Sequence, residues 1–102
     1  APEWVESELI STPGVAQAVV FGEGRPFNSA VIVPMPGLSA NAVDSAIAEA
    51  NHRLPDYARV HAWVPAREPF SVTNGMATGN GRPRRRAIWN AHAEHIEALY
   101  HP

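Results

Sequence analysis

The sequence predicts an α+β domain in which helices flank a small sheet of about three main strands. Three observations lead to this class. The chain has 102 residues, the length of a single domain. Its apolar share of 45% and charged share of 18% are those of a globular protein. Helical and strand-like periods follow one another in the order helix, strand, strand, helix, strand, loop or short hairpin, helix.

Apolar spacing and breaker residues define the six expected elements. In the helical segments apolar residues recur every three to four positions, whereas β-branched runs or alternation mark the strands. Thr12-Pro13-Gly14 and Leu54-Pro55 end the first two helices, and Ser39 is a suitable N-cap for the second. The expected helices cover 2–11, 39–53 and 83–100, and the expected strands cover 15–21, 28–34 and 58–65.

Two finer expectations concern which side chains face the core. Alternation in the third strand places Val60, Ala62 and Val64 on one face. The spacing of the last helix places His95 inward, and we expect His92 and the other histidines at the surface. Two histidines three residues apart can bind a metal, but no Cys, Asp or Glu is placed to complete a site, so no metal is expected.

Composition excludes several classes of function. The net charge of −2 gives no overall attraction to nucleic acid or to an anionic membrane, and the absence of cysteine excludes disulfides and thiolate chemistry. The sequence has no apolar run of transmembrane length and no secretory signal pattern. We therefore expect a cytoplasmic protein that binds no nucleic acid. Because Ala1-Pro2-Glu3 lies directly at a helix start, we also expect the chain to be part of a longer protein.

The least ordinary segment is "ATGNGRPRRRAIW", residues 77–89. A glycine-rich stretch leads through Arg82 into three consecutive arginines, Arg84, Arg85 and Arg86. All eight basic residues of the chain are arginine. Cations in the first turn of a helix are disfavoured by the helix dipole, by about 0.3–1 kcal/mol each. A carboxylate partner, a bound anion or hydration must offset this cost.

Two interpretations of the arginine cluster remain open. A third, a nucleic-acid patch, is disfavoured because the chain lacks a second basic stripe or an aromatic platform. In the first, the arginines are surface residues paired with Glu94, Glu97 or Asp56. In the second, they form an anion site together with the glycine amides of "GNG" and face a phosphate. The glycines of "GEGRP" (22–26) are better explained as a hairpin turn than as a phosphate loop. No Ser-His-Asp, GxSxG or paired-carboxylate signature is present.

Several segments, taken in order, resemble the C-terminal domain of the adenylate-forming (AMP-binding) enzymes, which include acyl-CoA synthetases, peptide-synthetase adenylation domains and luciferases. The opening "PEWVESELISTPGVAQAVVFGEGR" resembles the family's helix-to-strand start, and "NSAVIVP" its second strand. The segment "ANHRLPDYARVHAWVPAREPFSVTNGMATGNGRPRRRAI" resembles the late loop and last helix. The form "NGMATGNGR" is similar to that of the fatty-acyl and long-chain acyl-CoA synthetase branch.

This resemblance implies an enzyme that joins a carboxylic acid to ATP and then transfers the acyl group from the adenylate to a thiol, usually of CoA or a pantetheine arm. In this family a large N-terminal domain holds most of the ATP, Mg²⁺ and acid site, and the C-terminal domain rotates between the two half-reactions. The resemblance thus implies that residues 1–102 are a single swivelling domain, without the N-terminal domain and hinge. No cofactor is expected in the isolated domain, which should be inactive alone.

The resemblance also assigns residues. Arg82 falls at the position of the family's catalytic lysine, in a phosphate loop with Thr78, Gly79 and Gly81. A register with Arg84 at the lysine position would shift the glycine one residue too far away. Since the chain has no lysine, two alternatives stay open: Arg82 is a working cation, or the domain is a degenerate lid or partner-binding module that no longer adenylates.

Five further arginines receive roles from the resemblance. The cluster Arg84, Arg85 and Arg86 would bind an anion, anchor the loop or dock the large domain. The resemblance also assigns Arg53 and Arg59, on weaker similarity, to contacts with the phosphates of CoA.

Overall fold

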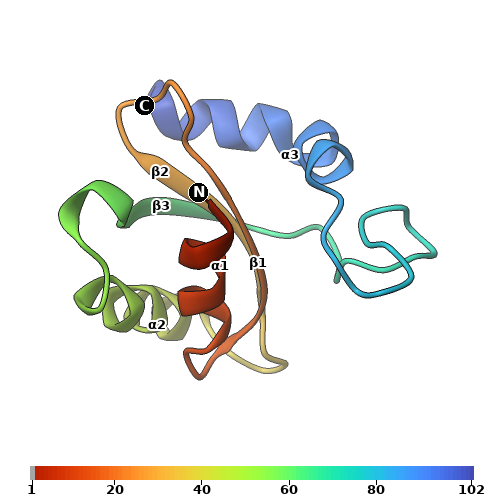
Figure 1. Ribbon diagram of the computed structural model, residues 1–102, viewed down its shortest axis with the longest axis horizontal. Helices are drawn as coiled ribbons and strands as arrows, with labels where there is room; N and C mark the ends of the chain where they lie inside the picture. Colours follow the sequence, from red (N-terminus) through yellow and green to blue (C-terminus); the bar gives the residue numbers. More distant parts are fainter. Residues whose placement is uncertain (1) are drawn as a thin grey trace.

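The fold is a mixed three-stranded sheet with helices on both faces, and it confirms the predicted α+β class and element order (Figure 1). The computed structural model describes residues 2–102. The elements are α1 (Pro2–Ile10), β1 (Val15–Phe21), β2 (Asn28–Pro34), α2 (Ala40–His52), a 3₁₀ turn (Asp56–Ala58), β3 (Val60–Pro65) and α3 (Arg85–Tyr100). The strand order is β1-β2-β3, with β1 antiparallel and β3 parallel to β2.

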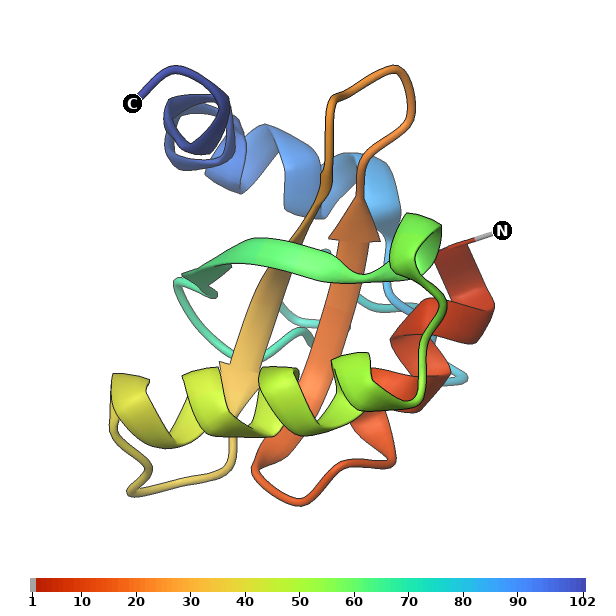
Figure 2. The ribbon, with the colours of Figure 1, turned by 90° about the vertical axis from the view of Figure 1, so that its left-hand side faces the viewer.

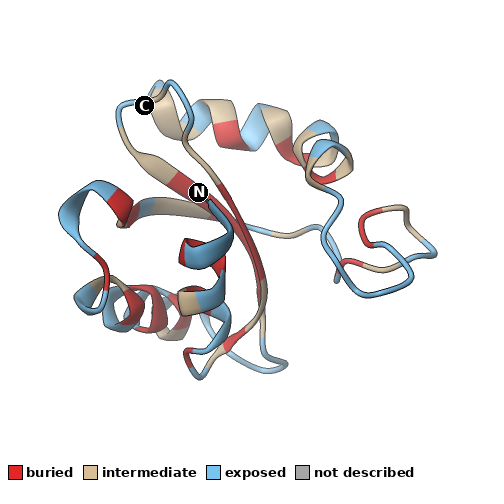
Figure 3. Ribbon diagram, viewed as in Figure 1, coloured by how far each residue is buried: buried red, intermediate tan, exposed pale blue. Residues whose placement is uncertain are grey.

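The sheet separates two apolar cores (Figures 2 and 3). Helices α1 and α2 cover one face of the sheet, and α3 covers the other. Alternate residues of β1 and β2 enter opposite cores, so both strands are buried on two faces and read as nearly continuous apolar runs. The first core includes Leu9, Val20, Ile32, Val43 and Ile47. The second includes Val19, Val31, Phe70, Ile88 and Ile96.

The predicted facing of β3 is wrong, because a bulge interrupts the strand. Val60 pairs with Asn28 and Ala62 pairs with Ser29, so His61 is an extra residue in the ladder. One extra residue moves all later side chains to the other face. Val60 therefore lies in the core of α1 and α2, whereas Val64 lies in the core of α3.

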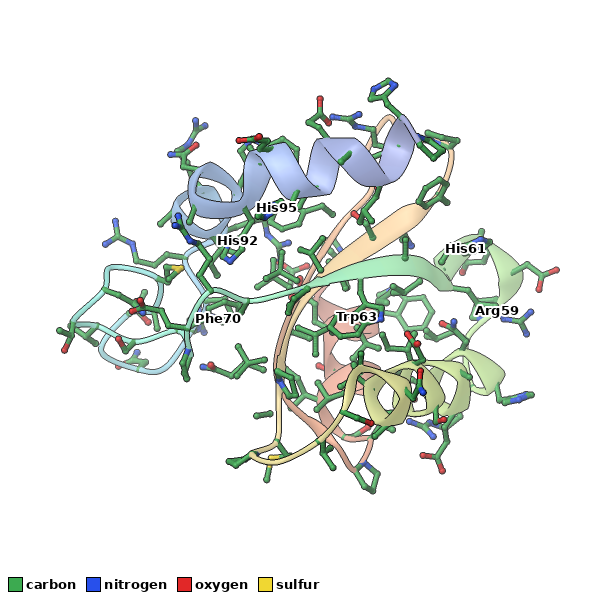
Figure 4. All side chains as sticks on the ribbon, turned by 180° about the vertical axis from the view of Figure 1, so that it is seen from behind. Arg59, His61, Trp63, Phe70, His92 and His95 are labelled. Atoms are coloured by element: carbon green, nitrogen blue, oxygen red, sulfur yellow. The ribbon has the colours of Figure 1, made fainter. Side chains whose placement is uncertain are left out.

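The histidine prediction is wrong for His92 and His95, whereas His52, His61 and His101 are exposed as predicted. His92 is 1% exposed, whereas His95 lies at the surface (Figure 4). The buried face of α3 runs through Ile88, His92 and Ile96, and His95 is displaced to its edge. The Arg67 amide donates to Nε2 of His92 at 3.0 Å, which leaves Nδ1 to donate to the Ile88 carbonyl at 2.7 Å. Both nitrogens of the buried neutral ring are thus satisfied.

Two element boundaries differ by two residues from the predicted ones, and the others agree to within one residue. The strand β3 begins at Val60 rather than at residue 58, because the 3₁₀ turn precedes it. The helix α3 begins at Arg85 rather than at Pro83, because Pro83 forms an antiparallel bridge with Ala77. The N-cap prediction for α2 is confirmed: the Ser39 hydroxyl accepts the Ala42 amide at 3.2 Å.

Candidate functional site

A short hairpin of residues 77–83, which we call the cationic hairpin, leads into α3. The bridge between Ala77 and Pro83 closes its base. The Thr78 amide donates to the Arg82 carbonyl at 2.8 Å, and the Arg82 amide donates to the Thr78 hydroxyl at 3.2 Å. Residues 78–83 are all exposed. The structure therefore brings Thr78, Gly79, Gly81 and Arg82 together on one projecting turn (Figure 1).

The two glycines of this turn have different structural roles. Gly81 has a φ of 82°, as expected where a three-residue loop ends in the left-handed conformation that glycine adopts without strain. Its amide donates to the Thr78 carbonyl at 2.9 Å. Gly79 has no such φ, and a Cβ built on it would meet no described atom within 4 Å. The fold requires glycine at 81, but it does not require glycine at 79.

The cationic hairpin stands on a folded support rather than on a loose loop. Met76 and Ala77 are buried in the core beneath α3. The Asn74 side chain accepts the amides of Ser71 and Met76 at 3.1 and 3.0 Å, which folds the preceding turn. These contacts order the segment that the sequence predicted as a long loop or short hairpin.

Sequence reasoning missed Gln17 as part of this support. From β1 its side chain accepts the Phe70 amide at 2.8 Å and donates to the Phe70 carbonyl at 3.2 Å. A glutamine within the β-branched run "VAQAVVF" was the available signal, since a polar side chain there needs a specific partner.

The three consecutive arginines divide into two kinds. Arg85 is half-buried and pairs with Glu6 of α1 at 2.8 Å. Arg84 and Arg86 are exposed and have no ion pair among the described residues. The predicted partners of the cluster are wrong, because other arginines already hold two of them: Glu97 pairs with Arg25, and Asp56 pairs with Arg59.

Within residues 2–102, half of the eight arginines form ion pairs and half do not. Arg82 is one of the four without a carboxylate partner, together with Arg67, Arg84 and Arg86. Three of these four belong to the cationic hairpin and the helix start that follows it. Arginines without a carboxylate partner among the described residues are therefore concentrated in the cationic hairpin and at the start of α3.

Arg53 and Arg59 lie elsewhere, near the C-terminal end of α2. Arg53 pairs with Glu8 at 2.8 Å. Arg59 donates to the carbonyls of Asn51 and Leu54 and pairs with Asp56 at 2.6 Å. Arg59 directly precedes β3, whereas Phe70 lies beyond the other end of that strand, in the segment that leads to the cationic hairpin (Figure 4).

A cleft of about 600 Å³ opens beside α1, the β1–β2 turn and the start of α3. Five of its lining side chains are aromatic: Trp4, Phe21, Tyr57, Trp89 and Tyr100. Among the described residues, no group of three or more His, Asp or Glu side chains could hold a metal ion. None of the described helices is long and apolar enough to cross a membrane.

The described domain combines a mixed three-stranded sheet, helices on both faces and an exposed turn before the last helix. The family model described as "AMP-binding enzyme C-terminal domain" matches residues 1–102, so the chain belongs to this family of adenylate-forming enzymes.

Solved structures of adenylating enzymes are similar to this chain. The A-PCP didomain of carboxylic acid reductase from Segniliparus rugosus, in complex with AMP, is 25% identical with a TM-score of 0.86, over 98% of this chain and 16% of that one. An acyl-CoA synthetase from Brucella canis is 22% identical with a TM-score of 0.68, over 93% of this chain and 18% of that one. The chain thus spans about a sixth of their length. No curated protein matches it.

Proposed function

We propose that the chain is the mobile C-terminal domain of an acyl-CoA synthetase-like enzyme, and that Arg82 enters the active site of an N-terminal domain. The complete enzyme would activate a carboxylic acid, in particular a fatty acid, with ATP. It would then transfer the acyl group from the adenylate to the thiol of CoA or a pantetheine arm. One observation supports the proposal: Arg82 is exposed on a hydrogen-bonded turn and has no ion-pair partner among residues 2–102. The sequence resemblance assigns this residue to the position of the family's lysine.

Arg82 can stabilise the negative charge that develops when the carboxylate attacks the α-phosphate. Its guanidinium can donate to two oxygens at once, whereas a lysine ammonium acts as a point charge. The turn is already fixed by the Thr78–Arg82 hydrogen bonds, so little ordering is needed as the cation arrives. ATP and Mg²⁺ would be held mainly by the N-terminal domain, since the described residues offer no metal cluster.

Arg84 and Arg86 would contact the N-terminal domain through complementary charge, because both are exposed beside Arg82. Arg53 and Arg59 remain candidates for the CoA phosphates. To serve in this way, each would exchange part of its present contacts with Glu8 or Asp56 for a phosphate.

The test is ATP–pyrophosphate exchange by the full-length enzyme with a series of straight-chain acids from acetate to palmitate. We expect Arg82→Ala to lower the exchange rate by about 10²–10³-fold, the cost of losing one charge-stabilising donor. Arg82→Lys should retain more activity than Arg82→Ala. Exchange at the wild-type rate in Arg82→Ala would exclude the proposed role.

A second candidate function rests on the replacement of the family lysine by arginine in a chain without lysine. In this alternative the enzyme accepts a preformed acyl-adenylate and transfers its acyl group, but does not form the adenylate. Wild-type enzyme that makes thioester from supplied acyl-adenylate, yet shows no exchange with any acid of the series, would favour it.

A further inference from the structure

We propose that Glu6 and Arg85 form a positioning pair that fixes the direction in which the cationic hairpin presents Arg82. This inference rests on the proposed function. It concerns how the hairpin is held, whereas the proposed function concerns what Arg82 does.

The pair is built around a single residue of β1. The Glu6 carboxylate accepts the Val20 amide at 2.7 Å and the Arg85 guanidinium at 2.8 Å. The other terminal nitrogen of Arg85 donates to the Val20 carbonyl at 2.7 Å. Glu6 and Arg85 therefore take up both backbone groups of Val20 and link three elements, α1, β1 and α3, at one point.

The Glu6–Arg85 pair differs from the other described ion pairs because its carboxylate is buried. The Glu6 side chain is 9% exposed and that of Arg85 is 38% exposed. In each of the other three pairs among residues 2–102 the carboxylate side chain is 36–93% exposed. A carboxylate removed from water in this way needs its partners in a fixed geometry. Exposed pairs tolerate rearrangement.

Packing also holds the Arg85 side chain in place. The guanidinium carbon lies 5.8 Å from the centre of the Phe21 ring. The Phe21 ring in turn meets the Trp89 ring edge-on, at 5.4 Å between centres. Since Trp89 lies one turn beyond Arg85 in α3, the first two turns of the helix are fastened to the end of β1.

The pair is directly connected to Arg82. Arg85 is three positions after Arg82 in the sequence, so their Cα atoms lie at most about 11 Å apart. Between them, the Arg84 amide donates to the Met76 carbonyl at 2.8 Å and closes the hairpin base. The cationic hairpin thus has two supports: the buried Met76 and Ala77 on its first arm, and the Glu6–Arg85 pair just beyond its second.

The pair also includes a residue of α1, the helix through which a rotation of the domain would be transmitted. In a C-terminal domain the preceding polypeptide enters through the first helix, and Glu6 lies on that helix, α1. A rotation of the domain would therefore be passed to the start of α3 through a buried contact, without a flexible loop between them. Loss of this contact would let the hairpin tilt while the two cores stay packed.

The experiment compares two carboxylate-to-amide variants in the full-length enzyme. Glu6→Gln keeps an acceptor for the Val20 amide but removes the charge that holds Arg85. Glu97→Gln is the matched control, because it removes the carboxylate of another arginine pair at the far end of α3. Exchange is measured with the acid of the acetate-to-palmitate series that turns over fastest, and thioester formation is measured from the corresponding supplied acyl-adenylate.

We expect Glu6→Gln to lower the kcat of exchange by about 10–100-fold, as a misplacement of about 1 Å can. The KM for ATP and the transfer from supplied adenylate should each stay within about threefold of wild type. Hydrogen exchange of the amides of residues 77–84 should become faster. Glu97→Gln should leave all of these quantities near their wild-type values. Arg85→Lys, which keeps the charge, should recover part of the kcat lost in Arg85→Met.

Wild-type exchange kcat and unchanged hydrogen exchange at 77–84 in Glu6→Gln would overturn the inference, even if the melting temperature falls. Exchange that survives in Arg82→Ala would instead remove the proposed function. Hydrogen exchange of the hairpin would then decide alone whether Glu6 orders it. If Glu6→Gln does not fold, Arg85→Lys and Arg85→Met provide the same comparison.

Discussion

Two regions of this domain are rich in arginine, and they use it in opposite ways. Near the end of α2, Arg53 and Arg59 are held by carboxylates and backbone carbonyls. At the start of α3, Arg84 and Arg86 have no ion pair among the described residues, and neither does Arg82 on the turn before them. The helix dipole disfavours cations in the first turn of a helix. The fold explains the paired arginines, whereas the exposed, unpaired ones are those for which we propose a partner outside the domain.

The largest expected effect is the loss of adenylation activity when Arg82 is replaced. Arg82→Ala should reduce adenylation by about 10²–10³-fold, because a charge-stabilising donor is lost. The same substitution should change the free energy of unfolding by less than about 0.5 kcal/mol, since the exposed Arg82 guanidinium has no ion pair with any described residue. Chemical denaturation and exchange assays on the same preparation measure both. A variant that loses stability and activity in parallel would contradict this separation.

The paired region should show the reverse pattern. Arg59→Ala removes donors to two backbone carbonyls at the end of α2 and the ion pair with Asp56. We expect it to lower the free energy of unfolding by about 1–2 kcal/mol, mostly from the carbonyl contacts, because the Asp56 side chain is almost fully exposed. Arg86→Ala is the matched control and should stay within about 0.5 kcal/mol. Equal losses in the two variants would erase the distinction between the regions.

The same comparison shows what the sequence could predict and what it could not. The fold class and element order depend on local periods and breakers such as Thr12-Pro13-Gly14, which are visible in the sequence. The extra residue at His61 was not predictable, because only its pairing with β2 reveals it. The partner of Arg85 was missed for a similar reason: Glu6 lies 79 positions away, and the nearer carboxylates were the natural guess.

The candidate site was likewise predictable only in part. The glycine-rich turn and Arg82 stand out in the sequence, and the structure places them on one projecting hairpin. Their catalytic role stays a prediction. The sequence could not predict that Arg85 is anchored whereas Arg84 and Arg86 are exposed. This difference depends on which side of α3 meets β1.

Substitution of the two glycines of the cationic hairpin should distinguish a glycine needed for the fold from one needed for activity. Gly81→Ala forces a side chain into the left-handed region and should cost about 1 kcal/mol of stability. Gly79→Ala should cost less than about 0.5 kcal/mol, since its added Cβ meets no described atom within 4 Å. If Gly79 allows close approach to a phosphate, Gly79→Ala should still lower the exchange rate. A Gly79→Ala enzyme with wild-type exchange would show that nothing approaches this side of the turn.

The smallest expected effect belongs to the exposed arginines that flank the anchor. Replacing Arg84 and Arg86 together with glutamine should leave stability within about 0.5 kcal/mol, because neither side chain has an ion pair among the described residues. If the two residues meet an acidic surface of the N-terminal domain, salt should slow the wild-type enzyme more than the double variant. Added ions weaken the attraction between exposed charges, and the screening length shortens to about 10 Å at 0.1 M. The measurement is the exchange rate against potassium chloride concentration, with Arg25→Gln as a control that removes one cation elsewhere. Equal salt slopes in all three enzymes would mean that Arg84 and Arg86 are solvated surface residues, which would leave Arg82 as the single cation of this region that acts on a partner.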